Sequence, residues 1–135
     1  METLTAGVLR FQHGAILTRD VYISIPFGWT AIVSRMLGQL CELPAAINLS
    51  LVVTSIEVDR NGLLVVDLRA EPGAMPPGTI RDVEAIIQEA KTQAAWTCGR
   101  DGRAGWLINP PKGCARTLCP DCQLEANVDL MCHQA

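Results

Sequence analysis

The sequence predicts an α+β fold in which an antiparallel hairpin or small sheet is packed by two amphipathic helices and is followed by a C-terminal zinc-ribbon-like knuckle. Three observations predict it: two segments with apolar residues at helical spacing, two β-branched runs joined by a turn signal, and five of the six cysteines within the last 38 residues. A chain of 135 residues is long enough for one core with a small appendage. We therefore expect an α+β core domain over residues 1–96 and a zinc-ribbon-like module with its tail over residues 97–135.

The first 25 residues contain two strand-like runs, residues 7–11 and residues 21–25. Both include β-branched and aromatic side chains, which favour strands. His13 and Gly14 break the pattern between them, and His13 is interpreted as a turn residue.

A helix is predicted over residues 29–41, because apolar residues recur there at i, i+3, i+4, i+7, i+8, i+11 and i+12. It is expected to end before Pro44, since the residue before a proline disfavours helical backbone. Cys41 falls on the apolar stripe and is interpreted as a small core residue. The stripe consists of Trp29, Ile32, Val33, Met36, Leu37, Leu40 and Cys41.

Two apolar runs, residues 49–59 and 63–70, flank the turn signal Arg60-Asn61-Gly62 and predict a β-hairpin. A two-residue loop would bury the Asp67 carboxylate beside Ile56, so a three-residue loop with a left-handed Gly62 is predicted. That register pairs Val58 with Leu64, Ile56 with Val66 and Thr54 with Leu68, and it makes this face apolar. The opposite, half-polar face would carry Val53, Glu57, Val65, Asp67 and Arg69.

A loop rich in proline and glycine over residues 71–78 precedes a second predicted helix. Thr79 is the expected N-cap, with Asp82 at the capping-box position. The predicted buried side carries Ile80, Val83, Ile86, Ile87, Ala90 and Ala94, and the predicted solvated side carries Arg81, Glu84, Gln88, Glu89 and Lys91.

The composition is that of a globular protein, with 49% apolar and 19% charged residues. The longest uncharged run, residues 43–56, is interrupted by Pro44 and Asn48 and is shorter than the roughly 20 apolar residues that a bilayer-spanning helix needs. The N-terminus lacks the pattern of a signal peptide, so we expect a cytoplasmic protein. Thiols stay reduced in the cytoplasm, which favours metal ligation over disulfides for clustered cysteines.

The cysteines near the C-terminus predict a site for one Zn²⁺. Structural zinc takes four ligands, commonly from two tight turns. Cys119 and Cys122 form one such turn, and Cys98 begins the other, but Asp101 stands three residues after Cys98 where a second cysteine is usual. The predicted ligands are Cys98, Cys119, Cys122 and Cys114, with Asp101 as the alternative fourth ligand and Cys132 and His133 as further competitors.

Two other interpretations of these cysteines stay open. In one, they are unliganded thiols in a tail. In the other, Cys119 and Cys122 form the active-site pair of a thiol oxidoreductase, which needs a strand leading into the pair and a helix N-terminus beside it. Residues 116–118 look too short for that strand.

The segment between the cysteines is locally basic although the chain carries a net charge of −3. Its basic residues and one tryptophan form the predicted partner-binding set, which consists of Arg100, Arg103, Trp106, Lys112 and Arg116. Four basic side chains make a weak footprint for nucleic acid. Trp96 and Trp106 are interpreted as packing the ribbon onto the second helix, with base stacking as the alternative.

These motifs resemble a family of small, largely uncharacterised proteins carried by phages, prophages and plasmids of proteobacteria. The resemblance covers roughly residues 26–123 and is most specific around the cysteines. Two of the four ligands that it implies differ here, because Asp101 replaces a cysteine and Cys122 replaces a histidine. The matching residues are Gly28-Trp29, the hairpin around Gly62, Thr97-Cys98 with Gly102 and Gly105, and Arg116-Thr117-Leu118-Cys119.

The resemblance implies a mobile-element protein acting in a bacterial host. The leading hypothesis is a non-enzymatic protein that binds a host protein complex, with inhibition of antiviral defence, in the manner of an anti-CRISPR protein, as its narrower form. No catalytic residue is predicted. The alternatives are a zinc protein that binds nucleic acid or regulates transcription, and a thiol oxidoreductase acting through Cys119 and Cys122.

Overall fold

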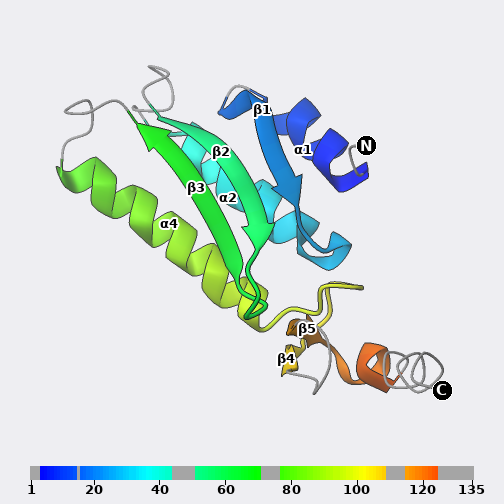
Figure 1. Ribbon diagram of the computed structural model, residues 1–135. Helices are drawn as coiled ribbons and strands as arrows, with labels where there is room; N and C mark the ends of the chain where they lie inside the picture. The colour runs from blue at the N-terminus through cyan, green and yellow to red at the C-terminus, as the bar shows by residue number, and fades with distance from the viewer. Residues whose placement is uncertain (1–3, 15, 44–50, 71–76, 109–114, 125–135) are drawn as a thin grey trace.

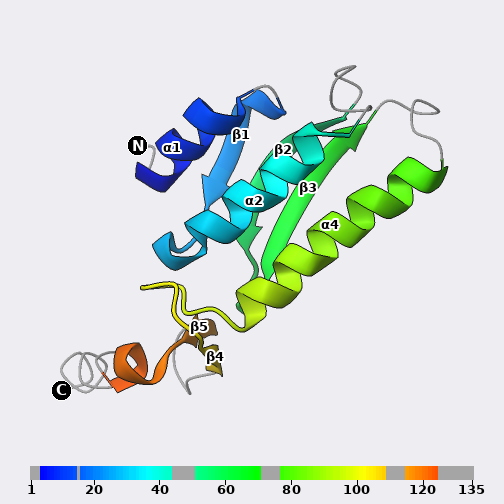
Figure 2. The same cartoon turned by 180° about the vertical axis from the view of Figure 1, so that it is seen from behind.

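The computed structural model describes residues 4–14, 16–43, 51–70, 77–108 and 115–124 and has an α+β architecture. A three-stranded sheet of order β1-β2-β3 is covered on one face by helices α2 and α4, while α1 lies beside β1 (Figures 1 and 2). A second, two-stranded sheet of order β4-β5 lies at one end of the first. The elements are α1 (Leu4–His13), β1 (Leu17–Ser24), the 3-10 turn η1 (Phe27–Trp29), α2 (Thr30–Cys41), β2 (Leu51–Val58), β3 (Leu64–Ala70), α4 (Pro77–Ala95), β4 (Trp106–Ile108) and β5 (Arg116–Leu118).

The segment over residues 7–11 is helical, so the prediction of a strand there is wrong. Ala6 and Leu9 are buried, and their spacing of three residues puts both on one side of a helix. The Arg10 guanidinium donates a 2.6 Å hydrogen bond from Nη2 to the Val21 carbonyl and ties α1 to β1. Packing against β1 and α2 therefore outweighs the β propensity of the segment.

The second N-terminal prediction, a strand over residues 21–25, is confirmed by β1, which starts earlier and ends at Ser24. Val21 and Ile23 are buried whereas Tyr22 and Ser24 are exposed, as expected for a strand with one buried face. β1 pairs in parallel with β2, and Ile23 lies opposite Ile56. The sheet is thus mixed, with α2 in the crossover between its parallel strands, and not the antiparallel sheet that we predicted.

The helix predicted over residues 29–41 is confirmed, with η1 as its first turn and α2 as its body. Thr30 donates a 2.6 Å hydrogen bond from Oγ1 to the Phe27 carbonyl across the junction. Cys41 is partly buried against the core, as predicted. The fully buried members of the stripe are Trp29, Val33, Met36, Leu37 and Leu40.

The β2–β3 hairpin confirms the predicted turn. The Asp59 amide donates to the Leu63 carbonyl at 2.9 Å, and Gly62 has φ +80°. Val58 lies opposite Leu64 and Ile56 opposite Val66, as predicted.

Beyond Ile56 the predicted register is wrong. Leu68 lies opposite Val53 and not Thr54, because the ladder shifts between Val53 and Ser55. One extra residue in β2 makes this a β-bulge, which moves Leu51 and Val53 onto the buried face together with Ile56. Val53 therefore leaves the half-polar face, where Asp67 and Arg69 are exposed, as predicted. Figure 1 views the sheet from this side, which none of the described helices covers.

Helix α4 begins at Pro77, so Thr79 lies inside the helix and the predicted N-cap is wrong. Proline suits the first helical position because its missing N–H would have no partner there. Val83, Ala90 and Ala94 are buried as predicted, whereas Ile80 in the first turns is 41% exposed. The solvated side is confirmed at Arg81, Glu84, Gln88 and Glu89, with Lys91 half-buried.

The buried residues form two hydrophobic clusters. The larger one joins α1, the three-stranded sheet, α2 and α4. The smaller one consists of Cys98, Leu118, Cys119 and Cys122, with Ile108 partly buried against it. None of the helices within the described ranges has the length and apolar character needed to cross a membrane.

Candidate metal centre and adjoining groove

The first cysteine lies in a tight turn directly after α4. The Cys98 amide donates to the Arg103 carbonyl at 2.7 Å, and the Gly102 amide donates to the Cys98 carbonyl at 3.0 Å. Gly102 has φ +80°, a conformation that glycine adopts at little cost. The Arg100 amide points at the Cys98 sulfur, with a distance of 3.4 Å between N and Sγ. The turn thus directs the Cys98 thiol and the Asp101 carboxylate to the same side.

The second turn follows the β4–β5 pair, in which Trp106 lies opposite Leu118. β5 leads directly into Cys119, and residues 120–124 are helical. The Cys122 amide donates to the Cys119 sulfur at 3.5 Å, which repeats the amide-to-sulfur contact of the first turn. A Cβ on Gly105 would lie 2.6 Å from the backbone of Leu118, so only glycine allows the two turns to approach this closely.

The two turns bring together Cys98, Asp101, Cys119 and Cys122, whose ligand atoms all lie within 4.8 Å of one another. The Cys119 and Cys122 thiols donate to Asp101 Oδ2 at 3.2 and 3.3 Å. Around one zinc ion, bonds of about 2.3 Å to sulfur and about 2.0 Å to oxygen at tetrahedral angles place S and O about 3.5 Å apart. The cluster is therefore close to the size that one tetrahedral ion requires, and it could hold a metal ion such as zinc.

Protonation in this cluster depends on the shared carboxylate. The pKa of the Asp101 carboxyl is well below its ordinary value because it accepts a hydrogen bond from the Arg103 amide and further ones from the thiols. Burial raises the pKa of the Cys122 thiol, and the neighbouring Cys119 and Asp101 raise it further. Burial also opposes ionisation of Cys98, but its backbone hydrogen bonds outweigh this effect and its pKa is lowered. A divalent cation would replace the protons that the thiols share with the carboxylate.

The 3-10 turn η1, which precedes α2, anchors the first cysteine turn. The Gly28 amide donates to the Gly99 carbonyl at 2.7 Å, and the Trp29 indole Nε1 donates to the Thr97 carbonyl at 2.9 Å. A Cβ on Gly28 would collide with the Cys98 carbonyl oxygen, so the close approach requires glycine. The Gly28-Trp29 and Thr97-Cys98 motifs, far apart in the sequence, thus contact each other.

The structure places the predicted ligands as follows. Cys98, Cys119 and Cys122 come together, and among the described residues the fourth group beside them is Asp101, the alternative that the sequence offered. Cys114, Cys132 and His133 lie outside the described residues.

Within the predicted partner-binding set, Arg100, Arg103, Trp106 and Arg116 are exposed on the module, and Lys112 lies outside the described residues. Arg103 forms an ion pair with Asp121, with 3.3 Å between Nη1 and Oδ2. Trp96 is 66% exposed and Trp106 is 46% exposed. The interpretation that both rings pack the ribbon onto the second helix is therefore wrong.

Sequence reasoning missed a groove of about 960 Å³ between α2, the end of α4 and the first cysteine turn. Its aromatic lining residues are Phe27 and Trp96, of which Phe27 is 68% exposed. Asp101 and Gly102 line it from the cysteine turn. The sequence gives no signal for this groove, because the exposure of Phe27 depends on the direction that the chain takes from β1 into η1.

His13, predicted as a turn residue, ends α1 and contacts α2. Its Nε2 lies 2.9 Å from Ser34 Oγ, and the Ser34 hydroxyl also lies 3.2 Å from Gln12 Oε1. Burial lowers the pKa of His13. A serine nucleophile would also need a group that orients the imidazole, and no carboxylate hydrogen-bonds His13 in the described part of the chain. The contact serves to join the two helices.

Comparisons with protein-family models, with curated proteins and with solved structures gave no match.

Proposed function

We propose that this chain is a non-enzymatic binding protein of a mobile element, which docks a host protein in the groove beside a zinc-stapled C-terminal module. The observation that carries the proposal is the position of Phe27 and Trp96, two largely exposed aromatic rings that line one groove. Large exposed aromatics in one place are typical of protein interfaces, where aromatic anchors contribute most of the binding energy.

Zinc in this proposal has a structural role. Three of the four ligand groups are buried thiols, and such closed sites with protein ligands at every position are typical of structural zinc. The ion would join the turn at Cys98 to the turn at Cys119 and Cys122. Because Asp101 lines the groove as well as the cluster, metal binding would also fix one wall of the groove.

The nature of the partner rests on the motif resemblance described above. A mobile-element protein with a rigid docking surface and a net acidic chain is suited to occupy a site on a host complex. Inhibition of antiviral defence is the narrower form of this proposal.

The proposal is tested by capture of partners from a bacterial host lysate with zinc-loaded protein. We expect a defined host protein to be retained by the wild type and lost with Phe27→Ala or Trp96→Ala. Tyr22→Ala is the matched control, because Tyr22 is 58% exposed and lies on β1, outside the groove. Equal retention by all four proteins, or no retained protein, would contradict the proposal.

Nucleic-acid binding is the second candidate, and the exposed Arg100, Arg103 and Arg116 favour it. Because phosphate contacts release counterions, binding would weaken steeply between low and physiological salt. Absence of retention on DNA and RNA at low salt would exclude it.

Thiol redox chemistry is the third candidate. From the sequence, residues 116–118 looked too short to form the strand that such a pair needs. The structure does form the short strand β5 there, and it leads into Cys119, which a helical segment follows. Against this candidate, Cys119 is 2% and Cys122 is 7% exposed, whereas a reactive thiol must be accessible. An insulin-reduction assay tests it, and activity that survives metal loading would support it.

A further inference from the structure

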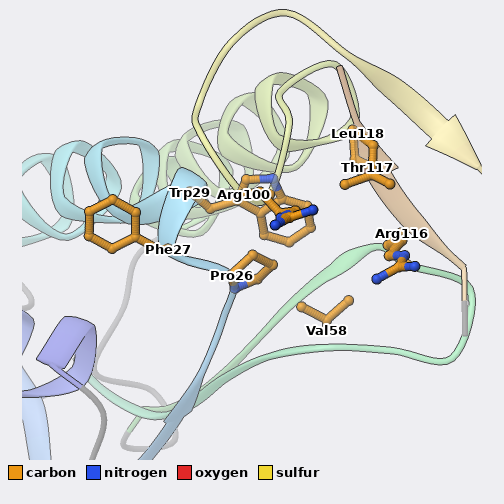
Figure 3. Close-up of a pocket in the computed structure, with 10 residues that line it drawn as sticks. Pro26, Phe27, Trp29, Val58, Arg100, Arg116, Thr117 and Leu118 are labelled. Atoms are coloured by element: carbon orange, nitrogen blue, oxygen red, sulfur yellow. The ribbon is translucent and has the colours of Figure 1, made fainter. Parts of the chain in front are cut away.

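A second cavity lies where the core meets the cysteine module. Of the described residues that line it, Phe27 also lines the proposed docking groove. The second cavity has a volume of about 420 Å³, within the size range of small-molecule sites. Three parts of the chain form its walls: the segment from Pro26 to Trp29, the end of the β2–β3 hairpin, and the module with β5 (Figure 3).

The cavity combines an apolar floor with positive charge. Pro26, Trp29 and Val58 supply apolar surface, while Arg100 and Arg116 line it from the cysteine turn and from β5 (Figure 3). None of the described residues that line it is acidic. Arginine presents a planar fork of donors that matches carboxylate and phosphate oxygens, so the charge of this cavity suits an anion.

We propose that this cavity binds a small amphipathic anion, a carboxylate or phosphate monoester on an aromatic or short aliphatic body. The anionic group lies between Arg100 and Arg116, and the body rests on Pro26 and Val58. The volume of about 420 Å³ accommodates a single ring with its head group. Apart from Phe27, the described residues of this site differ from those of the docking groove, and the proposal does not depend on the identity of any protein partner.

The test is an NMR titration of the zinc-loaded chain with phenyl phosphate, phenylacetate, inorganic phosphate and benzyl alcohol. We expect phenyl phosphate or phenylacetate to bind at least about ten-fold more tightly than inorganic phosphate and benzyl alcohol, because only they supply both the anion and the body. The amide signals of Gly62, Gly99 and Thr117 should shift, since these residues line the cavity. The stronger of the two acids identifies the preferred head group.

Charge variants separate this site from general surface electrostatics. Arg116→Gln and Arg100→Gln should each weaken binding by about ten-fold, whereas Arg69→Gln, which removes the same charge from an exposed position on β3, should leave it unchanged. Zinc content and melting temperature are measured for each variant, and Arg116→Gln carries the test if Arg100→Gln disturbs the metal turn. Equal weakening by Arg69→Gln, equal affinity for inorganic and phenyl phosphate, or shifts away from the cavity would overturn the proposal.

Discussion

Replacement of Asp101 by alanine tests the composition of the metal centre. The structure gives this carboxylate the fourth position beside three thiols, with Oδ2 at 3.2 and 3.3 Å from two of them. Loss of a group that only supports a metal ligand costs 10- to 100-fold in metal affinity, so loss of the ligand itself should cost about 100-fold or more. Because bound metal stabilises only the folded state, the melting temperature in limiting zinc should fall by roughly 5–10 °C.

The matched control is Asp121→Ala. Asp121 lies one residue before Cys122, and its replacement removes the same charge. Its side chain is 76% exposed and pairs with Arg103, which also lies 3.9 Å from Asp101 Oδ2, but Asp121 is not a member of the cluster. Exposed ion pairs contribute little to stability, so zinc affinity and melting temperature should stay close to the wild-type values.

Competition with a chromophoric chelator gives the zinc affinity, and cobalt substitution reports the ligands. Asp101→Cys should restore a closed site, and the sulfur-to-cobalt absorbance per ion should rise by about one third as thiolates increase from three to four. If Asp101→Ala and Asp121→Ala bind zinc equally well, Asp101 is not a ligand and the cluster needs another fourth group. If natively purified protein carries no transition metal and chelator leaves its melting curve unchanged, the metal proposal itself fails.

Four further substitutions, with Gly7→Ala as a control, test how the core holds the module and how the helices are joined. Gly28→Ala should lower zinc affinity and destabilise the fold by about 1–3 kcal/mol, because the added Cβ would meet the backbone of the first cysteine turn. In the control Gly7→Ala the added Cβ meets nothing within 4 Å, so this variant should stabilise α1. Thermal melts measure the stability of each variant, and chelator competition measures its zinc affinity. Trp29→Phe should cost about 1–3 kcal/mol in denaturant unfolding, since it leaves a carbonyl of that turn without its indole donor. Burial lowers the pKa of His13 below its unfolded value of about 6.5, so the unfolded chain binds the proton more readily, and the free energy of unfolding should fall as the pH drops from 7 to 5. His13→Asn should make the free energy of unfolding depend less steeply on pH. An unchanged pH dependence would contradict this reasoning. Ser34→Ala should lower the free energy of unfolding by about 0.5–1.5 kcal/mol at neutral pH.

The parts of the fold that follow from local pattern could be predicted from the sequence. The apolar stripe over residues 29–41 repeats at helical spacing, and the structure buries five of its seven members because the helix has one face on the sheet. The turn at Gly62 could be predicted because this hairpin loop needs a residue with positive φ, which glycine adopts readily. The meeting of Cys98 with Cys119 and Cys122 follows from the spacing that two-turn metal sites require.

The β-bulge carried a signal that the uniform register overlooked. The buried residues Leu51 and Val53 lie two apart, whereas the next buried residue, Ile56, follows Val53 by three. One extra residue between buried positions of a strand is the pattern that a bulge produces.

The remaining differences depend on tertiary contacts. Residues 7–11 have strand-like composition, and only packing against β1 and α2 makes them helical. The parallel pairing of β1 with β2 joins segments separated by a whole helix, and no local pattern encodes it. Asp101 could be proposed as a ligand from its position after Cys98, but its closeness to the Cys119 and Cys122 thiols is a tertiary contact that only the geometry shows.

The parallel pairing of β1 also constrains the order of assembly during translation. β1 and α2 leave the ribosome before β2, so β1 has no strand to pair with until a later segment has been made. The β2–β3 hairpin closes locally and fast, whereas β1 must be recruited from a distance, at a higher cost in chain entropy. In a nascent chain, the apolar side chains of β1, Val21 and Ile23, would therefore stay exposed longer than those of β2 and β3. β1 is then the segment to which a chaperone would bind.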